Sequence, residues 1–214
     1  MKGNDMSHSL FSSPRPARPD SPATWWRRIC WVTPRIAASG DLPGDHANAL
    51  IHLNRWVSAG ITHVIDLREE ANDSRFVATN SDIKYHRFGV DDNGTQRSGR
   101  WFDDLTKVAT QILSEPNSKI IVHCHMGVNR GPSALFAILL ALGWDDLDAL
   151  RAIRNARPIA AVLYAPDATR WNAIRTGATK TEVEERVGHV KAWLDRNYLD
   201  LCYVIDSIGN RLAV

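Results

Sequence analysis

The sequence predicts an α/β fold with a mainly parallel central sheet flanked by helices. Short apolar segments of strand composition, such as ITHVIDL at 61–67, alternate along the chain with longer segments in which apolar residues recur at helical spacing. Strands that alternate with helices pair mainly in parallel, since each helix carries the chain back across a face of the sheet. At 214 residues, the chain is long enough for one such domain with additional segments at its ends.

The first predicted element is a helix over 50–59, whose apolar residues share one face and which Gly60 ends. The strand ITHVIDL follows directly, and a second strand is expected over 84–90. The sequence DDNG at 91–94 then predicts a turn, because Asn and Gly adopt the left-handed backbone conformations that tight turns need.

The second half of the chain continues this alternation with one strand and several helices. The strand is expected over 120–123, where IIVH is a short apolar run. The helices are expected over 101–113, over 132–142 up to Gly143, from Asp145 or Asp146 to Arg157, and from Pro166 onwards. Proline is favoured in the first turn of a helix and glycine just after the last turn, which sets several of these limits.

Both ends of the chain differ from this alternating region. Residues 1–23 are rich in Pro, Ser and Arg without apolar periodicity, which predicts a disordered arm before a main domain over 24–178. Residues 179–214 form an expected helical extension, for which Thr181 and Glu184 fit a capping box. Its apolar stripe consists of Val183, Val187, Val190, Leu194, Tyr198, Leu201, Ile205 and Ile208. We expect this stripe to pack on its own domain rather than form a dimer, so a monomer is favoured.

The composition restricts the class of protein and its partners. The net charge is +2, so no general affinity for nucleic acid follows. The longest apolar run is far shorter than the roughly 20 residues that span a bilayer, so no membrane partner is expected. Three cysteines make no even set for a disulfide framework, which favours a reducing, cytoplasmic location. Cys30 and Cys202 form either a disulfide or two buried thiols.

The segment VHCHMGVNRGPS carries the strongest chemical signal. Cys124 follows the expected strand 120–123, Gly127 lies in the loop, and Arg130 directly precedes the next helix. A strand–loop–helix of this kind points successive backbone N–H groups into a concavity at the positive end of a helix dipole, which is an anion site. Arg130 adds a bidentate guanidinium. In such a site we expect the pKa of Cys124 to be depressed and its side chain to be a nucleophilic thiolate.

This segment resembles the His-Cys-x5-Arg phosphate loop of the protein tyrosine and dual-specificity phosphatases. The resemblance runs from about 36 to 171. GITHVIDLREE looks like the family's segment before the acid loop, and FGVDDNG looks like the acid loop itself. ARPIAAVLYAPDATRW resembles the helical end of the compact dual-specificity domain. The resemblance implies hydrolysis of phosphate monoesters on a phosphorylated protein, on phosphotyrosine and perhaps phosphoserine or phosphothreonine, without metal or cofactor.

The roles of individual residues are also implied by this resemblance. Cys124 attacks phosphorus, Asp92 protonates the leaving oxygen, and water then hydrolyses the cysteinyl-phosphate. Asp92 rather than Asp91 fits the acid position, because the family carries an apolar residue two places before its acid, here Val90. His123 orients the loop and helps to keep the thiolate charged. The phosphate-binding residues are His125, Met126, Gly127, Val128, Asn129 and Arg130.

One position departs from the family's pattern. Most members carry Ser or Thr directly after the arginine, where the hydroxyl assists release of the thiolate in the second step. Gly131 stands there in this chain, and Ser133 follows two residues later. Either Ser133 reaches back towards Cys124, or breakdown of the phosphoenzyme is slow.

Other functions remain open at this stage. A pseudophosphatase would bind phosphoproteins without turnover, and the change to Gly131 is compatible with one. RNA 5′-triphosphatases share an Asn before the loop arginine, here Asn129, but no basic track for RNA is evident near the loop. A metal site is not expected, because the cysteine and histidines lack a second ligand pair. The sequence Arg68-Glu69-Glu70 either borders the substrate cleft or, as the simpler interpretation, forms a solvated loop.

Overall fold

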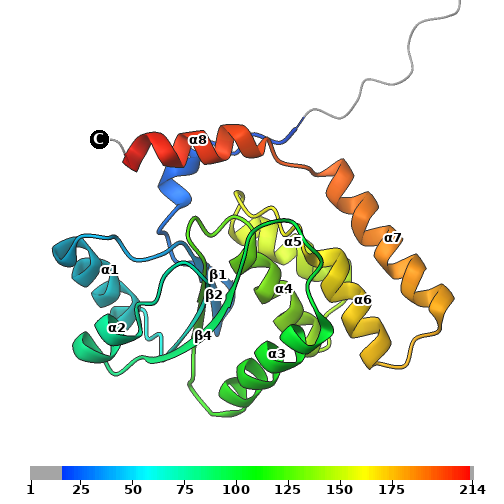
Figure 1. Ribbon diagram of the computed structural model, residues 1–214, viewed down its shortest axis with the longest axis horizontal. Coiled ribbons are helices and arrows are strands. Elements are labelled where there is room, and N and C mark those ends of the chain that lie inside the picture. The colour runs from blue at the N-terminus through cyan, green and yellow to red at the C-terminus, as the bar shows by residue number, and fades with distance from the viewer. Residues whose placement is uncertain (1–15, 213–214) are drawn as a thin grey trace, which may run out of the picture.

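The computed structural model describes residues 16–212, and this part of the chain folds as an α/β sandwich around a five-stranded sheet (Figure 1). The strands are β1 (Cys30–Thr33), β2 (Ile36–Ser39), β3 (His63–Arg68), β4 (Lys84–Val90) and β5 (Ile120–His123). Their order is β1-β2-β5-β3-β4, and all neighbours pair in parallel except β1 and β2. The predicted fold class is therefore confirmed.

Helices cover both faces of the sheet, and the last two helices of the described chain pack outside these layers. The helices of the described chain are α1 (His46–Ser58), α2 (Ser74–Asn80), α3 (Gly99–Ser114), α4 (Arg130–Ala141), α5 (Asp146–Ala156), α6 (Ala165–Arg175), α7 (Lys180–Arg196) and α8 (Leu201–Leu212), after a short 3-10 helix η1 (Pro22–Trp25). In β5, Ile121 packs with α1 and α2, whereas Ile120 and Val122 pack with α3 to α6. This alternation is what a strand buried on both faces requires.

Local capping residues explain why several helices begin earlier than apolar periodicity predicts. The Asp45 side chain accepts a hydrogen bond from Asn48 N (2.9 Å), so α1 begins at residue 46 rather than 50. Ser98 caps α3 in the same way, with Trp101 N as the donor. An N-cap satisfies backbone N–H groups that the helix itself leaves unpaired. The strands β1 and β2 and the helix α2 were not predicted, because they are too short to show a period.

The C-terminal extension is two helices rather than one bent helix. The capping box at its start is formed by Thr179 and Glu182, not by Thr181 and Glu184. The chain breaks between α7 and α8, where the Asp200 carboxylate accepts a hydrogen bond from Tyr203 N (3.0 Å). Helix α7 packs against α6, and α8 lies over η1 (Figure 1). Both helices therefore bury apolar faces against the same chain, and the expectation of a monomer stays a prediction.

The predicted disordered arm needs a correction at its C-terminal end, whereas residues 1–15 lie outside the described residues. Ala17 N donates to Tyr198 O (2.8 Å), Asp200 N donates to Ala17 O (3.1 Å), and Arg18 pairs with the Asp200 carboxylate at 2.7 Å. These bonds use mainly the backbone, so the composition of residues 16–23 gave no sign of them. They clamp the beginning of the described chain onto the segment before α8.

Two further expectations concern cysteines and membranes. Cys30 and Cys202 are both free, so they form no disulfide, and Cys202 is exposed rather than buried. Within residues 16–212, every helix is too short or too polar to cross a lipid bilayer.

Candidate active site

The predicted nucleophile lies directly after the central strand of the sheet. β5 runs between β2 and β3 and ends one residue before Cys124, and α4 begins at Arg130. In sheets of this kind, ligands bind beyond the carboxyl ends of the parallel strands. Cys124 is buried and borders a cavity of about 240 Å³, together with Arg130 and Asp92. The structure thus brings the three predicted catalytic residues to one cavity.

The loop 125–129 turns every one of its backbone carbonyls towards the surrounding framework. The donors, at 2.6–3.0 Å, are Asp41 N and Trp26 Nε1 for His125 O, Arg157 Nη2 for Met126 O, Arg157 Nε for Gly127 O, Ala161 N for Val128 O, and Ser133 N for Asn129 O. A peptide unit is planar with its N–H opposite its C=O. The N–H groups of residues 126–130 therefore point to the other side, and successive N–H groups of this kind form an anion-binding concavity.

A single buried arginine holds much of this arrangement. Arg157 is fully buried and donates to the carbonyls of Met126 and Gly127 in the loop and to those of Trp25 (2.8 Å) and Trp26 (2.9 Å) beside it. Gly127 has a φ of 66°, and a Cβ at this position would collide with the Arg157 guanidinium and with a backbone carbonyl. Glycine is required there because the loop approaches its support so closely.

Arg130 is engaged by a carboxylate in this structure. Its Nη1 and Nη2 donate to Oε2 (2.7 Å) and Oε1 (2.6 Å) of Glu70, a bidentate pair with the geometry that guanidinium also forms with phosphate. The hydrogen bonds from Arg130 lower the pKa of Glu70 to about 2, so its carboxylate is ionised at any physiological pH. Glu70 therefore takes the position that two phosphate oxygens would take on Arg130. The interpretation of residues 68–70 as a solvated loop fits the exposed Glu69, but not the buried Arg68 or the paired Glu70.

The state of the Cys124 thiol differs from the sequence-based expectation. Burial raises its pKa, and the N–H groups of Gly131 and Gly127 and the charge of Arg130 oppose this shift without outweighing it. The Asp92 carboxylate adds to the rise of the pKa, and Glu70, paired with Arg130 at 2.6 Å, offsets part of the guanidinium charge near the sulfur. The thiolate is therefore disfavoured while Arg130 stays paired with Glu70.

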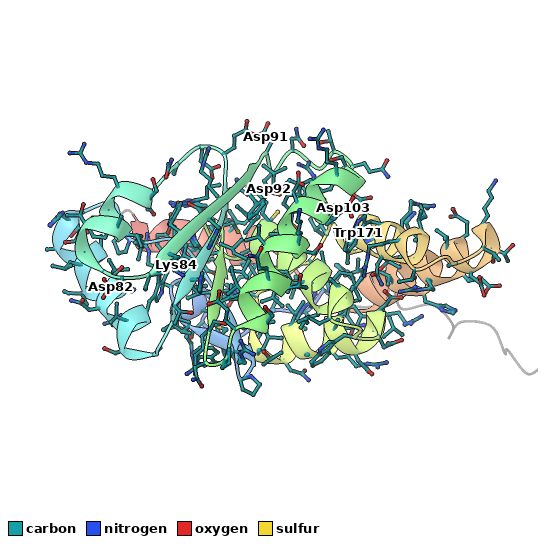
Figure 2. All side chains as sticks on the ribbon, turned by 90° about the horizontal axis from the view of Figure 1, so that it is seen from below. Asp82, Lys84, Asp91, Asp92, Asp103 and Trp171 are labelled. Atoms are coloured by element: carbon teal, nitrogen blue, oxygen red, sulfur yellow. The ribbon has the colours of Figure 1, made fainter. Side chains whose placement is uncertain are left out.

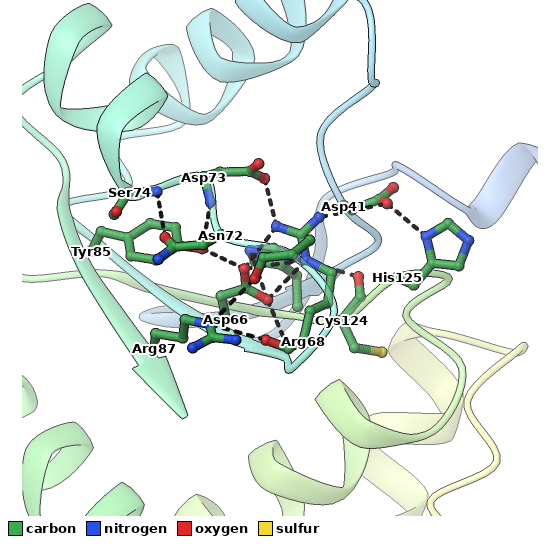
Figure 3. A network of polar contacts seen from close by, with 12 residues as sticks. Asp41, Asp66, Arg68, Asn72, Asp73, Ser74, Tyr85, Arg87, Cys124 and His125 are labelled. Carbon is green, nitrogen blue, oxygen red and sulfur yellow. Dashed lines mark hydrogen bonds and ion pairs between the residues drawn. The ribbon is translucent and has the colours of Figure 1, made fainter. Parts of the chain in front are cut away.

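A buried ion-pair network supports the loop from the side of β3 (Figure 3). Arg68 donates to the carboxylates of Asp66 (2.7 Å) and Asp73, and its Nη1 lies 3.8 Å from Asp41 Oδ2. The same Asp41 oxygen lies 2.7 Å from Nδ1 of His125, the residue after Cys124. This chain of contacts links the end of β3 to the first residue of the loop, so Arg68 has a structural role that its exposed-looking sequence context did not indicate.

His123 supports the loop without carrying charge. It is fully buried against Trp56, and its Nδ1 lies 3.4 Å from the carbonyl oxygen of Cys124. Burial lowers the pKa of His123, so the neutral imidazole is favoured. A role in orienting the Cys124 peptide is compatible with this geometry, whereas the expected charge stabilisation of the thiolate is not.

Asp92 faces the loop and Asp91 does not. Asp92 Oδ1 accepts hydrogen bonds from Asn129 Nδ2 (2.7 Å) and from the Tyr164 hydroxyl (3.0 Å), and Oδ2 lies 3.6 Å from Arg130 Nε. Figure 2 shows Asp91 at the outer edge of the turn and Asp92 further in, and Asp91 is exposed. Burial and Asp92 raise the pKa of Tyr164, which keeps this hydroxyl protonated as a donor.

Ser133 is occupied by partners other than Cys124. Its hydroxyl donates to Asn129 Oδ1 (3.3 Å) and accepts a hydrogen bond from Tyr164 N (3.2 Å). Ser133 therefore fixes the amide that holds Asp92, and does not reach back towards the sulfur. Gly131 lies so close to the Cys124 peptide that an added Cβ would be 3.3 Å from Cys124 N, tight but without a severe clash.

The described residues contain no cluster of three or more His, Cys, Asp or Glu side chains with the spacing of a metal site. The polar side chains that border the cavity are the Cys124 thiol, the Arg130 guanidinium, the Asp92 carboxylate, the Asn129 amide and the His125 imidazole. These groups suit recognition of an oxyanion directly by the protein.

Comparison with known proteins identifies the family. The model of the dual specificity phosphatase catalytic domain matches residues 48–162, which is more than half of the chain. The chain belongs to the dual specificity phosphatase family. It is 24% identical over 139 residues to mouse dual specificity protein phosphatase 13B, covering 63% of this chain and 70% of that protein. It is 29% identical over 99 residues to Protein phosphatase Slingshot of Drosophila melanogaster, covering 46% of this chain but only 9% of that protein.

Solved structures share the fold at low sequence identity. PTPMT1 in complex with PI(5)P matches with a TM-score of 0.59 and 16% identity, over 71% of this chain and 97% of that chain. Human DUSP28 matches with a TM-score of 0.57 and 14% identity, over 76% and 99%. The human tyrosine phosphatase-like serine/threonine/tyrosine-interacting protein matches with a TM-score of 0.55 and 18% identity, over 71% and 99%. The predicted recognition of the family is thus confirmed.

Several residues of this dual specificity phosphatase site were not found from the sequence. Arg157 was interpreted only as the end of a helix, and Asp41 and Tyr164 had no assigned role. The three lie more than 30 residues from Cys124 in the chain, and only the fold brings them to the loop. The only local sign of a special role for Arg157 was the motif ARPI at 156–159. Its proline ends α5 and restricts the backbone conformation of Arg157.

The pair between Glu70 and Arg130 predicts how Cys124 reacts with alkylating agents. In a Glu70→Gln variant only Asp92 still offsets the Arg130 charge, so the pKa of Cys124 falls and its alkylation by iodoacetamide becomes faster near pH 7. The measurement is the alkylation rate of Cys124 between pH 5 and 10, followed by mass spectrometry.

Glu69→Gln is the matched control for this experiment. It removes the same charge one residue away, where the side chain is exposed and makes no contact with Arg130. Its alkylation profile should overlay that of the unchanged protein. An equal shift in both variants would mean that general charge, and not the Glu70–Arg130 pair, governs the thiol.

Proposed function

We propose that the protein is a cysteine-dependent phosphatase that hydrolyses phosphate monoesters on proteins through a cysteinyl-phosphate intermediate. The observation that carries this proposal is the convergence of Cys124, Arg130 and Asp92 on one cavity beside an amide-lined loop. A nucleophile, an anion clamp and an acid are the three groups that such a transfer requires.

In the first step, the phosphate dianion displaces Glu70 from Arg130. Its equatorial oxygens bind the Arg130 guanidinium and the N–H groups of residues 126–130. The Cys124 thiol passes its proton to an oxygen of the bound phosphate dianion, and the loop N–H groups and Arg130 stabilise the resulting thiolate beside the phosphate monoanion. The sulfur then attacks phosphorus, the bond to the ester oxygen breaks, and Asp92 gives that oxygen a proton.

In the second step, water replaces the sulfur. Asp92, now a carboxylate, removes a proton from water, whose oxygen attacks phosphorus and releases the Cys124 thiolate with inorganic phosphate. Asn129 and Tyr164 hold Asp92 in the position that both steps require. Because Gly131 carries no hydroxyl and Ser133 is bonded elsewhere, this step lacks the usual assistance and is expected to be the slower one.

The proposed substrate is a phosphorylated protein, with phosphotyrosine as the main target and phosphoserine or phosphothreonine as further ones. Cys124 works as a free thiol, and all three cysteines of the chain are unpaired, which supports a reducing compartment such as the cytoplasm. The apolar faces of α7 and α8 are packed on their own domain, which supports action as a monomer.

Turnover of p-nitrophenyl phosphate with and without vanadate tests the proposal. We expect vanadate-sensitive hydrolysis by the unchanged protein and its loss in Cys124→Ser, because a hydroxyl lacks the nucleophilic anion that a thiol provides. Cys124→Ser should keep its fold and its affinity for phosphate. Residual activity within tenfold of the unchanged protein would contradict the role of Cys124, and a folded protein without any turnover would indicate a phosphoprotein-binding module instead.

The two neighbouring aspartates provide a matched test of the acid. Asp92→Asn should lower kcat on phenyl phosphate, which has a poor leaving group, by about 10² to 10⁴, the usual contribution of a positioned acid. Asp91→Asn, the control, should cost less than about tenfold because the hydrogen bonds to Asn129 and Tyr164 are made by Asp92. The loss from Asp92→Asn should be smaller on p-nitrophenyl phosphate, whose leaving group needs less protonation. The opposite ranking of the two variants would assign the acid to Asp91.

A further inference from the structure

The catalytic cavity has a wall that lies outside the matched family domain. The side chains of Leu201 and Ile205 border the same cavity as Cys124 and Arg130. Both belong to α8, which begins 39 residues after the last residue of the match at 162. They are four positions apart and therefore lie on the same face of the helix. Figure 1 shows α8 lying across one end of the domain, next to η1.

This wall is held in place by packing of neighbouring residues on the same flank of α8. Val204 and Ile208 of α8 are fully buried, in a cluster that also contains Val128 of the phosphate loop and Trp26. The start of the helix is tied to Arg18 through the Asp200 carboxylate at 2.7 Å. Because α8 is anchored to the loop itself, its cavity-facing residues keep a defined distance from Cys124.

The wall is apolar, which phosphate binding alone does not require. Met126, Val128 and Leu163 continue the apolar surface on which Leu201 and Ile205 lie. Ile205 is 44% exposed, so a large apolar side chain meets water at the mouth of the cavity. Covering such a side chain with an apolar group of a ligand is favourable, because it removes apolar surface from water.

The size of the cavity fits an aromatic ring beside a phosphate. Its volume is about 240 Å³, whereas an apolar cavity of about 150 Å³ is enough to bind benzene. A second groove shares Asp92, Asn129 and Leu163 with the cavity and offers a path for the peptide on one side of the ring. In a phosphoserine or phosphothreonine the phosphate lies next to the backbone, so no comparable group can reach the α8 wall.

We propose that Leu201 and Ile205 are specificity-determining residues, which bind the ring of a phosphotyrosine and favour aryl over alkyl phosphate esters. The proposal rests on the proposed function for its reaction, and adds the residues that select the substrate. The α8 helix thereby converts a general phosphate loop into a site with a preferred class of ester.

A binding experiment tests this without depending on turnover. In the Cys124→Ser background, the dissociation constants of phenyl phosphate and inorganic phosphate are measured by calorimetry, with and without Leu201→Ala plus Ile205→Ala. We expect phenyl phosphate to bind about tenfold or more weakly in the double variant, since two apolar contacts are removed, and inorganic phosphate to change less than about twofold. Equal weakening of both ligands, or no change in either, overturns the proposal.

A kinetic experiment tests the specificity itself. In the protein with Cys124 intact, kcat/KM is measured on a phosphotyrosine peptide and on a phosphothreonine peptide of otherwise identical sequence. The double variant should lose about tenfold or more on the first and less than about threefold on the second. An equal loss would mean a general structural effect, and a gain on both peptides would mean that α8 is an inhibitory cover; either result overturns the proposal.

The controls separate specificity from folding and from the proposed function. Asp206→Ala changes an exposed residue of the same helix that does not border the cavity. It should leave unchanged the ratio of the dissociation constants of the two ligands and the ratio of kcat/KM on the two peptides. Ile205→Gln alone, at a half-exposed position, gives the same test if the double variant melts at a lower temperature. If the protein hydrolyses neither peptide, the proposed function fails, while the binding experiment still decides whether α8 recognises the ring.

Discussion

The site depends on one constraint, the outward orientation of the carbonyls in loop 125–129. A loop that presents N–H groups to an anion must place the opposite ends of the same peptides against other donors, and buried carbonyls without partners would cost free energy. Arg157 satisfies two of them and Ala161 N a third. The rest of the framework, from Trp26 to α5, can be understood as the support that keeps these donors in position.

The charges around the loop follow from the same constraint. An amide-lined concavity with Arg130 at its edge is strongly positive, and the chain offsets that charge with the half-exposed carboxylate of Glu70. Burial raises the pKa of the Cys124 thiol, so its protonated form is favoured in the free site. A buried, protonated thiol reacts more slowly with alkylating reagents than an exposed thiolate does, so this arrangement protects Cys124 while the site is free.

Sequence reasoning worked where a signal is local. The limits of β4 and β5 were predicted correctly, because an apolar run bounded by turn residues is visible within a few positions. The position of Cys124 between a strand and a helix was predicted for the same reason. The resemblance to the family then indicated Asp92, which faces the loop in the structure, although its role as the acid stays a prediction.

Sequence reasoning failed where two contacting residues lie far apart in the chain, or where a residue is one of many of the same type. Arg157 is one of many arginines, and its burial follows only from the meeting of η1, the loop and α5. The sequence Arg68-Glu69-Glu70 has the composition of a solvated loop, and Glu70 is separated in the chain by 60 residues from Arg130, its partner. The apolar stripe of the C-terminal extension was visible in the sequence, but the break between α7 and α8 was not. This break places Leu201 and Ile205 at the cavity, which the stripe alone does not predict.

The most direct test of this account is an NMR titration of the backbone amides with inorganic phosphate, carried out on nitrogen-15-labelled protein with Cys124→Ser. The account predicts that the largest shifts of amide resonances fall on residues 126–130, since their N–H groups line the site. Binding of phosphate with the largest shifts elsewhere, or no shift in the loop at saturating phosphate, would contradict the claim that the outward carbonyls create an oxyanion site.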